Sequence, residues 1–244
     1  MGINGTSLAD NNLSWGVQES YGTNGQGNGA SANADWRATY GELKAAYDYD
    51  KNQRRLSYGI QGGVLAHEDG ITIGQPLDST SILIKAPGVN GVSVNNQTGV
   101  RTDWRGYALV PTANPFRKNT ISLNTETLPN DVDLELTSKT VVPTKGAVVI
   151  AEYKANIGRR VILSLSRKDG SPVPFGAIAS LNNGEQNSIV GDDGQVYLSG
   201  LPDSGILNVK WGKSIDEQCR VDFNLSSDSG SSEYSMRIID RKCY

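Results

Sequence analysis

The stretch "ASANADWRATY", residues 30–40, alternates strictly between two kinds of side chain. One phase carries alanine and aromatic residues without any charge, and the other is polar throughout. The first phase is Ala30, Ala32, Ala34, Trp36, Ala38 and Tyr40, and the second is Ser31, Asn33, Asp35, Arg37 and Thr39. Because successive side chains of a strand point to opposite faces, this stretch predicts a β-strand with one clean apolar face.

The same alternation recurs on both sides, in "NNLSWGVQESY" (11–21), "ELKAAYDYD" (42–50) and "RLSYGIQGGVLA" (55–66). The apolar phase is Ala, Gly and aromatic as often as Val, Ile or Leu, so it would fill a soluble core poorly. Its Tyr and Trp residues fall near strand ends, where the interfacial girdle of an outer-membrane barrel places them. The pattern favours strands of a transmembrane β-barrel, and a half-buried sheet of a soluble domain is the alternative.

The bulk composition excludes several classes of protein. The 244 residues contain 23 Lys and Arg against 26 Asp and Glu, a formal net charge of -3. This balance gives no reason to expect a nucleic-acid partner. No apolar run is long enough for a transmembrane helix, and the first residues lack the basic and apolar regions of a signal peptide.

From about residue 76 the sequence changes to short strands separated by Pro- and Gly-containing turns. This spacing predicts a small β-sandwich. A second block of the same kind begins near residue 155, with the turn signals Asp169-Gly170 and Asp193-Gly194 and a last strand at 234–239. The strands expected in the first block are 81–85, 92–95, 106–110, 119–123, 131–136, 139–142 and 147–153.

No catalytic or metal-binding motif stands out, so we expect neither an enzyme nor a cofactor. The one histidine, His67, precedes Glu68 and Asp69, and a turn at a strand end explains it better than a metal site does. The same holds for Asp192-Asp193, which is followed by Gly194. The two late cysteines, Cys219 and Cys243, indicate a disulfide and an oxidising compartment, and two unrelated buried thiols are the alternative.

At "NQTGVRTDWRGYALVP" (96–111) the chain closely resembles the C-terminal end of the fimbrial outer-membrane ushers of the chaperone–usher pathway. The resemblance continues through 119–153, through "DGSPVPFGAIAS" (169–180) and through "VGDDGQVYLSGLPDSGILNVKWG" (190–212). Upstream, "LADNNLSWGVQESYG" is similar to the last barrel strands of the same family. The match covers essentially the whole chain.

The resemblance implies an all-β chain in three parts: incomplete barrel strands over 1–76, a first C-terminal sandwich over 77–154 and a second over 155–244. It implies an outer-membrane location with periplasmic C-terminal domains. The implied partners are lipid, through the barrel strands, and a periplasmic chaperone carrying its pilus subunit. Ushers join subunits by strand addition, without bond-making chemistry. The family's N-terminal domain and plug have no counterpart in this sequence, which we interpret as a truncation, a split reading frame or a fragment.

Aromatic residues and arginine are enriched at binding hot spots, and four such residues near the start of the first sandwich are our candidates for partner contact. They are Trp104, Arg105, Tyr107 and Phe116. The alternative for each is a place in the core of that sandwich or at its seam with the barrel. The alternative for the whole chain is a soluble, secreted multi-sandwich binding or adhesive protein.

Overall fold

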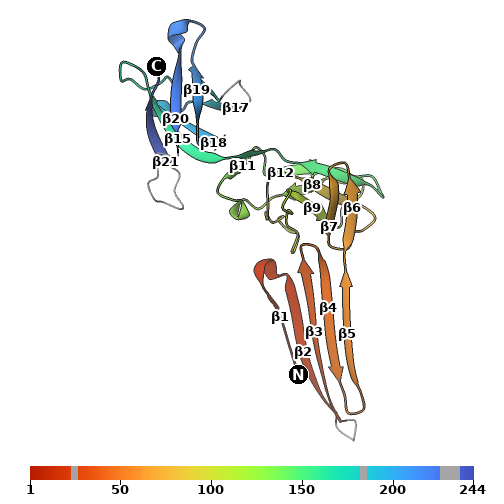
Figure 1. The fold of residues 1–244 in the computed structure, drawn as a ribbon. Coiled ribbons are helices and arrows are strands. Elements are labelled where there is room, and N and C mark those ends of the chain that lie inside the picture. The colour runs from red at the N-terminus through yellow and green to blue at the C-terminus, as the bar shows by residue number, and fades with distance from the viewer. Residues whose placement is uncertain (23–26, 182–185, 226–236) are drawn as a thin grey trace. The chain divides into compact units, whose positions relative to one another are not determined.

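The structure is a computed structural model, and it describes residues 1–22, 27–181, 186–225 and 237–244. The described chain consists of β-strands joined by turns and short 3-10 segments, which confirms the predicted all-β fold (Figure 1). It divides into two compact units. Unit 1 comprises residues 1–129 and 134–155, and unit 2 comprises residues 130–133 and 156–244.

Unit 1 begins with a five-stranded antiparallel sheet in the order β1-β2-β3-β4-β5. Its strands are long and follow one another up and down (Figure 1). They are β1 (Gly2–Ser7), β2 (Leu13–Gly22), β3 (Gly27–Ala38), β4 (Gly41–Tyr49) and β5 (Arg54–Gln61). A sequential antiparallel sheet of this kind is the pattern of transmembrane barrel strands, here as an open segment.

The register of this sheet collects the apolar phases of its strands on one face. Trp36 on β3 lies opposite Leu13 on β2 and Leu43 on β4. The same face continues across β4 and β5, where Leu43 pairs with Ile60 and Tyr47 with Leu56. A register shifted by one residue would move each of these side chains to the other face. The alternation in the sequence therefore fixes the face that the sheet presents.

The run at 55–66, expected as one strand, is interrupted at Gly62. β5 ends at Gln61, and the next strands, β6 (Gly63–His67) and β7 (Gly70–Gly74), form a two-stranded sheet of their own. A Cβ at Gly63 would collide with the Leu77 side chain and the Gln75 carbonyl, so only glycine fits there. We therefore propose that the first sandwich begins at Gly63 and not after residue 76.

The rest of unit 1 is organised around β8 (Ser81–Lys85), which is buried on both faces. It pairs in parallel with β13 and antiparallel with β9, and this central place explains its continuous apolar run Ile82, Leu83 and Ile84. Residues 92–95, expected as a strand, form only isolated bridges at Ser93 and Val94. The other strands are β9 (Tyr107–Val110), β10 (Asn119–Ser122), β12 (Ser138–Val141) and β13 (Val148–Glu152).

Unit 2 is a sandwich of a three-stranded sheet, β18-β15-β21, and a four-stranded sheet, β17-β16-β19-β20. Alternate residues of β15, such as Val161, Leu163 and Leu165, are buried in its core, as the sequence predicts. The strands of the unit are β15 (Arg159–Ser166), β16 (Ile178–Leu181), β17 (Gln186–Ile189), β18 (Gln195–Leu201), β19 (Ser204–Lys210), β20 (Gln218–Asn224) and β21 (Arg237–Lys242). Two short strands, β11 (Val132–Leu134) and β14 (Ala155–Ile157), lie where the chain passes between the units.

The predicted disulfide between Cys219 and Cys243 is present, with the two Cα atoms 5.4 Å apart. Cys219 lies on β20, and Cys243 directly follows β21 and donates its backbone N–H to Ser166. The bond therefore ties the two sheets of unit 2 together. The last strand was expected at 234–239 and is observed from Arg237, while residues 234–236 lie outside the described part.

Candidate functional site

The apolar face of the β1–β5 sheet is the first candidate surface of unit 1. Its large side chains are exposed, among them Leu56 (68%), Tyr58 (86%) and Ile60 (82%) on β5. Such a continuous apolar face indicates an interaction site, because soluble monomers rarely leave one open. In the described ranges, no helix is long and apolar enough to cross a membrane.

The opposite face of the same sheet is polar and carries its own ion pairs. Lys44 lies 3.6 Å from Asp35 and 3.4 Å from Glu42, measured from Nζ to the carboxylate oxygens. Arg37 Nε lies 3.8 Å from Glu42. The apolar phase carries charge only near one end of the sheet, at Glu19 and Arg54 beside Ala30 and Tyr49. A polar, charged phase and a mainly apolar phase are what a wet lumen and a lipid face require of barrel strands.

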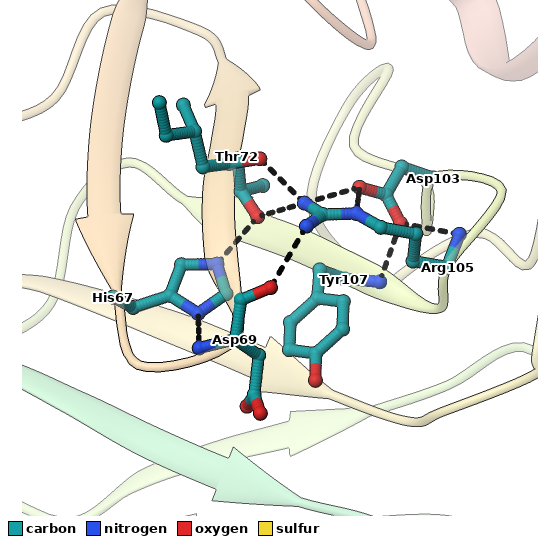
Figure 2. Close-up of polar contacts among 7 residues, drawn as sticks. His67, Asp69, Thr72, Asp103, Arg105 and Tyr107 are labelled. Atoms are coloured by element: carbon teal, nitrogen blue, oxygen red, sulfur yellow. Dashed lines mark hydrogen bonds and ion pairs between the residues drawn. The ribbon is translucent and has the colours of Figure 1, made fainter.

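A second candidate lies in unit 1, where Arg105 joins the β6–β7 hairpin to the loop before β9 (Figure 2). Its guanidinium donates to the backbone carbonyls of Asp69 (3.1 Å) and Ile71 and to Thr72 Oγ1 (3.2 Å). It also pairs with Asp103 at 3.2 Å. Gly106 follows with φ +93°, and a Cβ there would collide with the Ala86 carbonyl. The tight loop therefore needs glycine beside the arginine.

Charged and aromatic groups surround this arginine. Lys85 Nζ lies 2.7 Å from Asp69, and its hydrogen bond lowers the pKa of the Asp69 carboxyl, helped by the Tyr107 hydroxyl. The same bond raises the pKa of Lys85. Burial, followed by the nearby Asp69, raises the pKa of Tyr107. The His67 ring stacks on Tyr107 with centroids 4.9 Å apart and bonds Thr72 through Nε2 at 2.9 Å.

These contacts place the four predicted partner residues in different situations. Tyr107 is buried, and Arg105 is hydrogen-bonded to the hairpin, so contact of these two with a partner stays a prediction. Trp104 and Phe116 are 76% and 69% exposed, and both remain candidates for contact with a partner. Arg105 also forms a cation–π contact with Trp104, its Cζ lying 5.7 Å from the ring centroid.

Neither acidic cluster considered in the sequence forms a metal site in the described ranges, where no group of three potential ligands converges. His67 Nδ1 accepts the Asp69 backbone N–H at 3.3 Å, as a turn residue would. Asp192 and Asp193 belong to the 3-10 turn η4 (Asp192–Gly194) before β18.

In unit 2 the structure reveals exposed apolar residues that the sequence reading missed. Ile178 on β16 and Ile189 on β17 are paired across the sheet, 49% and 71% exposed. Phe175, three residues before β16, is also exposed. Alternation alone predicts one exposed phase but does not reveal that its members are apolar and adjacent on neighbouring strands.

The open antiparallel sheet with one apolar face, followed by small sandwiches, defines an all-β protein with a segment of barrel-like strands. Residues 1–153 match the family described as outer membrane usher protein, and the chain belongs to that family. Residues 162–227 match a second family, described as the PapC C-terminal domain.

Individual relatives agree with this assignment. The chain is 46% identical over 227 residues to the outer membrane usher protein LpfC of Salmonella typhimurium, covering 92% of this chain and 27% of that protein. It is 45% identical over 231 residues to the outer membrane usher protein FimD of Escherichia coli K12, covering 93% and 26%. The chain therefore spans about a quarter of the length of these relatives.

A solved structure supports the fold. It is the cryo-EM structure of the E. coli P pilus tip assembly intermediate PapC-PapD-PapK-PapG in the second conformation. The match has a TM-score of 0.57 at 24% identity and covers 100% of this chain and 30% of that chain.

Proposed function

We propose that this chain is the C-terminal part of an outer-membrane usher that holds chaperone–subunit complexes during pilus assembly and export. In this proposal β1–β5 lie in the outer membrane, and both sandwiches lie in the periplasm. The observation that carries the proposal is membership of the usher family, which extends over residues 1–153 and continues in the related domain at 162–227.

The arrangement of side chains on β1–β5 supports the membrane part of this proposal. The apolar face would contact lipid, where a charge at mid-depth costs about 2–4 kcal/mol. The face that carries Asp35, Lys44 and Glu42 would line the lumen, where water solvates these charges at little cost. The two faces thus match the two environments of a barrel wall.

Exposed apolar side chains on the sandwiches support the binding part. Trp104 and Phe116 in unit 1, and Ile178 beside Ile189 in unit 2, leave apolar area in water that a protein partner would cover. We propose that binding is moderate, with a dissociation constant of about 1 µM, because each subunit has to be released to the next.

We further propose that the chain performs no bond-making chemistry, in keeping with assembly by strand addition. The alternative of a soluble, secreted adhesive protein is not favoured, because it would not explain a family match that includes the apolar-faced strands at 1–61.

Calorimetry on the whole chain in detergent micelles tests the proposal. The titrants are the cognate chaperone–subunit complex and the chaperone alone. Binding of the complex in the micromolar range supports the function. If neither titrant binds at tens of micromolar, the holding role is refuted.

A further inference from the structure

One end of unit 2 contains a cavity of about 760 Å³ that no step of the proposed function uses. It lies where β19 ends and β20 begins, and the turn after β15 and the residues after β21 complete its wall. We call it the basic recess and define it by Arg167, Lys168, Lys210, Trp211, Arg220 and Tyr244. The disulfide at Cys219 and Cys243 also lines it.

Positive charge predominates in the recess. Four of its lining residues are cationic, namely Arg167, Lys168, Lys210 and Arg220, against the two carboxylates Asp169 and Asp216. Within the described ranges, none of the four cations forms an ion pair. An excess of unpaired cations in a recess attracts an anionic ligand.

One of the two carboxylates, that of Asp169, already accepts hydrogen bonds within its own turn. Asp169 accepts the backbone N–H of Ser171 at 3.0 Å and the hydroxyl of the same residue. These bonds lower the pKa of Asp169, and the charge of nearby Arg167 acts in the same direction. The carboxylate therefore stays ionised and offsets part of the cationic charge, and the four cations against two carboxylates still leave the recess with an excess of positive charge.

Arg167 supplies the second observation. Its Nε is buried and has no acceptor among the described residues. Arg167 as a whole is partly exposed and lines the recess, so a ligand carboxylate can reach its side chain from there. A guanidinium group suits a carboxylate because both groups are planar and can form two parallel hydrogen bonds with each other.

The recess also offers apolar and hydrogen-bonding surface beside the charge. Trp211 packs against the core of unit 2, and Tyr244 is exposed beside Arg220, with which it exchanges two backbone hydrogen bonds of 2.9 Å. Asn208 lies between Ser180 and Arg220 across three strands. Trp, Tyr and Arg together are the composition of a protein-binding hot spot.

We propose that the basic recess binds a short acidic segment of a partner protein, with a carboxylate at Arg167 and a neighbouring apolar side chain against Trp211. The choice of a protein as the occupant rests on the proposed function. The carboxylate would complete the bonds of Arg167, and Lys210 and Arg220 would add attraction that weakens as salt is raised.

The test uses the whole chain in detergent and an end-blocked peptide rich in Asp and Phe that carries a neutral dye. Fluorescence anisotropy measures its binding, and the same peptide with Asn in place of Asp is the reference. We expect the acidic peptide to bind about tenfold or more tightly than the Asn peptide, as for a charge-assisted bond. Arg167→Gln and, separately, Lys210→Gln should each remove most of this preference.

Arg160→Gln is the matched control, because Arg160 lies on β15 but does not line the recess. Lys210 is exposed, so its substitution keeps the test valid if Arg167→Gln fails to fold. Equal binding of the two peptides, or no effect of either recess variant, overturns the proposal. Displacement by millimolar inorganic phosphate, or binding of phosphatidylglycerol vesicles in place of the peptide, also overturns it.

Titration of the chaperone–subunit complex against the same variants separates this inference from the proposed function. If the complex binds the chain and both recess variants equally, the function stands and the recess proposal fails. If the acidic peptide binds through Arg167 but the complex does not bind, the recess stands and the proposed function fails.

Discussion

Arg105 and Asp103 form an ion pair in the loop directly before β9, with Nη2 of the arginine 3.2 Å from Oδ2 of the aspartate. The other oxygen of the same carboxylate accepts the backbone N–H groups of Arg105 (2.9 Å) and Tyr107 (2.8 Å). Asp103 thus shapes the loop and aims the guanidinium at the β6–β7 hairpin, more than thirty residues earlier in the chain.

Replacing this arginine should loosen the hairpin. Arg105→Lys keeps the charge but cannot reach Asp69 O, Ile71 O and the buried carboxylate of Asp103 together, so some of these acceptors lose their donor. We expect a loss of about 2–3 kcal/mol and hydrogen exchange of residues 63–74 faster by about thirtyfold or more. Arg117→Lys, at an exposed position, is the control. Unchanged exchange in the hairpin would show that Arg105 does not anchor it.

The pair of Lys85 and Asp69 predicts a dependence on pH. The folded-state pKa of Asp69 is lowered, so its stabilising contribution is present above about pH 4 and is lost as the pH falls through the folded value. The pKa of Lys85 is raised, so its contribution is present below about pH 10 and is lost only as the pH rises through the folded value.

The variant Asp69→Asn should therefore unfold at a lower temperature than the unchanged chain at pH 7, and the difference should shrink as the pH falls below about 4 and through the lowered pKa of Asp69. Thermal melts followed by circular dichroism across this range measure it. A difference that stays constant down to the lowest pH would mean that the Asp69 charge contributes nothing.

Removing the disulfide should weaken unit 2. The bonded cysteines are 24 residues apart, and a loop of this length is worth about 3–4 kcal/mol in the chain-entropy model. The double variant with Cys219→Ser and Cys243→Ser should lose about this amount in denaturant unfolding. Equal midpoints for oxidised and reduced unchanged chain would contradict the prediction.

The alternating residues predicted β2–β5 well, because a strand with lipid on one face and water on the other has to alternate. The same rule could not locate the end of the sheet. Residues 55–64 alternate past the end of the strand, yet the chain leaves the sheet at Gly62, since Gly63 packs against Leu77 and Gln75. This contact joins residues distant in sequence and leaves no periodic signal.

For the candidate site around Arg105, the sequence predicted which residue types take part but not which of them are exposed. Trp104, Arg105 and Tyr107 are adjacent in the sequence, but burial separates them, with Trp104 in solvent and Tyr107 in the core. The bonds from Arg105 to the carbonyls of Asp69 and Ile71 involve backbone atoms, which any residue type supplies. Likewise, Lys210, Arg220 and Arg167 line one recess because β15 and β19 end close to where β20 begins.

The lipid face predicts different surroundings for the tryptophans. Trp36 lies on the apolar face of β3, whereas Trp104 is exposed on the first sandwich. In single-tryptophan variants reconstituted in brominated phospholipid, emission from Trp36 should be strongly quenched and emission from Trp104 should not. Equal quenching of the two would argue against β3 as a lipid-facing strand.

A substitution at Phe116 should affect partner binding and the stability of unit 1 differently. It is 69% exposed and has φ 60°, a left-handed conformation that is strained for a bulky residue, and its N–H donates to Pro143 O at 2.7 Å. Glycine adopts this conformation freely, and removing an exposed ring loses little packing. Phe116→Gly should therefore leave the stability of unit 1 unchanged or raise it by up to about 1 kcal/mol.

Binding should change in the opposite direction if the ring contacts a partner. We expect Phe116→Gly to weaken the affinity for the chaperone–subunit complex by about tenfold, the effect of a peripheral hot-spot aromatic. Gly146→Ala is the control for backbone effects, because Gly146 also has positive φ but carries no side chain for a partner to lose. If Phe116→Gly binds the complex with full affinity, Phe116 does not contact the partner. Trp104 would then be the remaining aromatic candidate in unit 1.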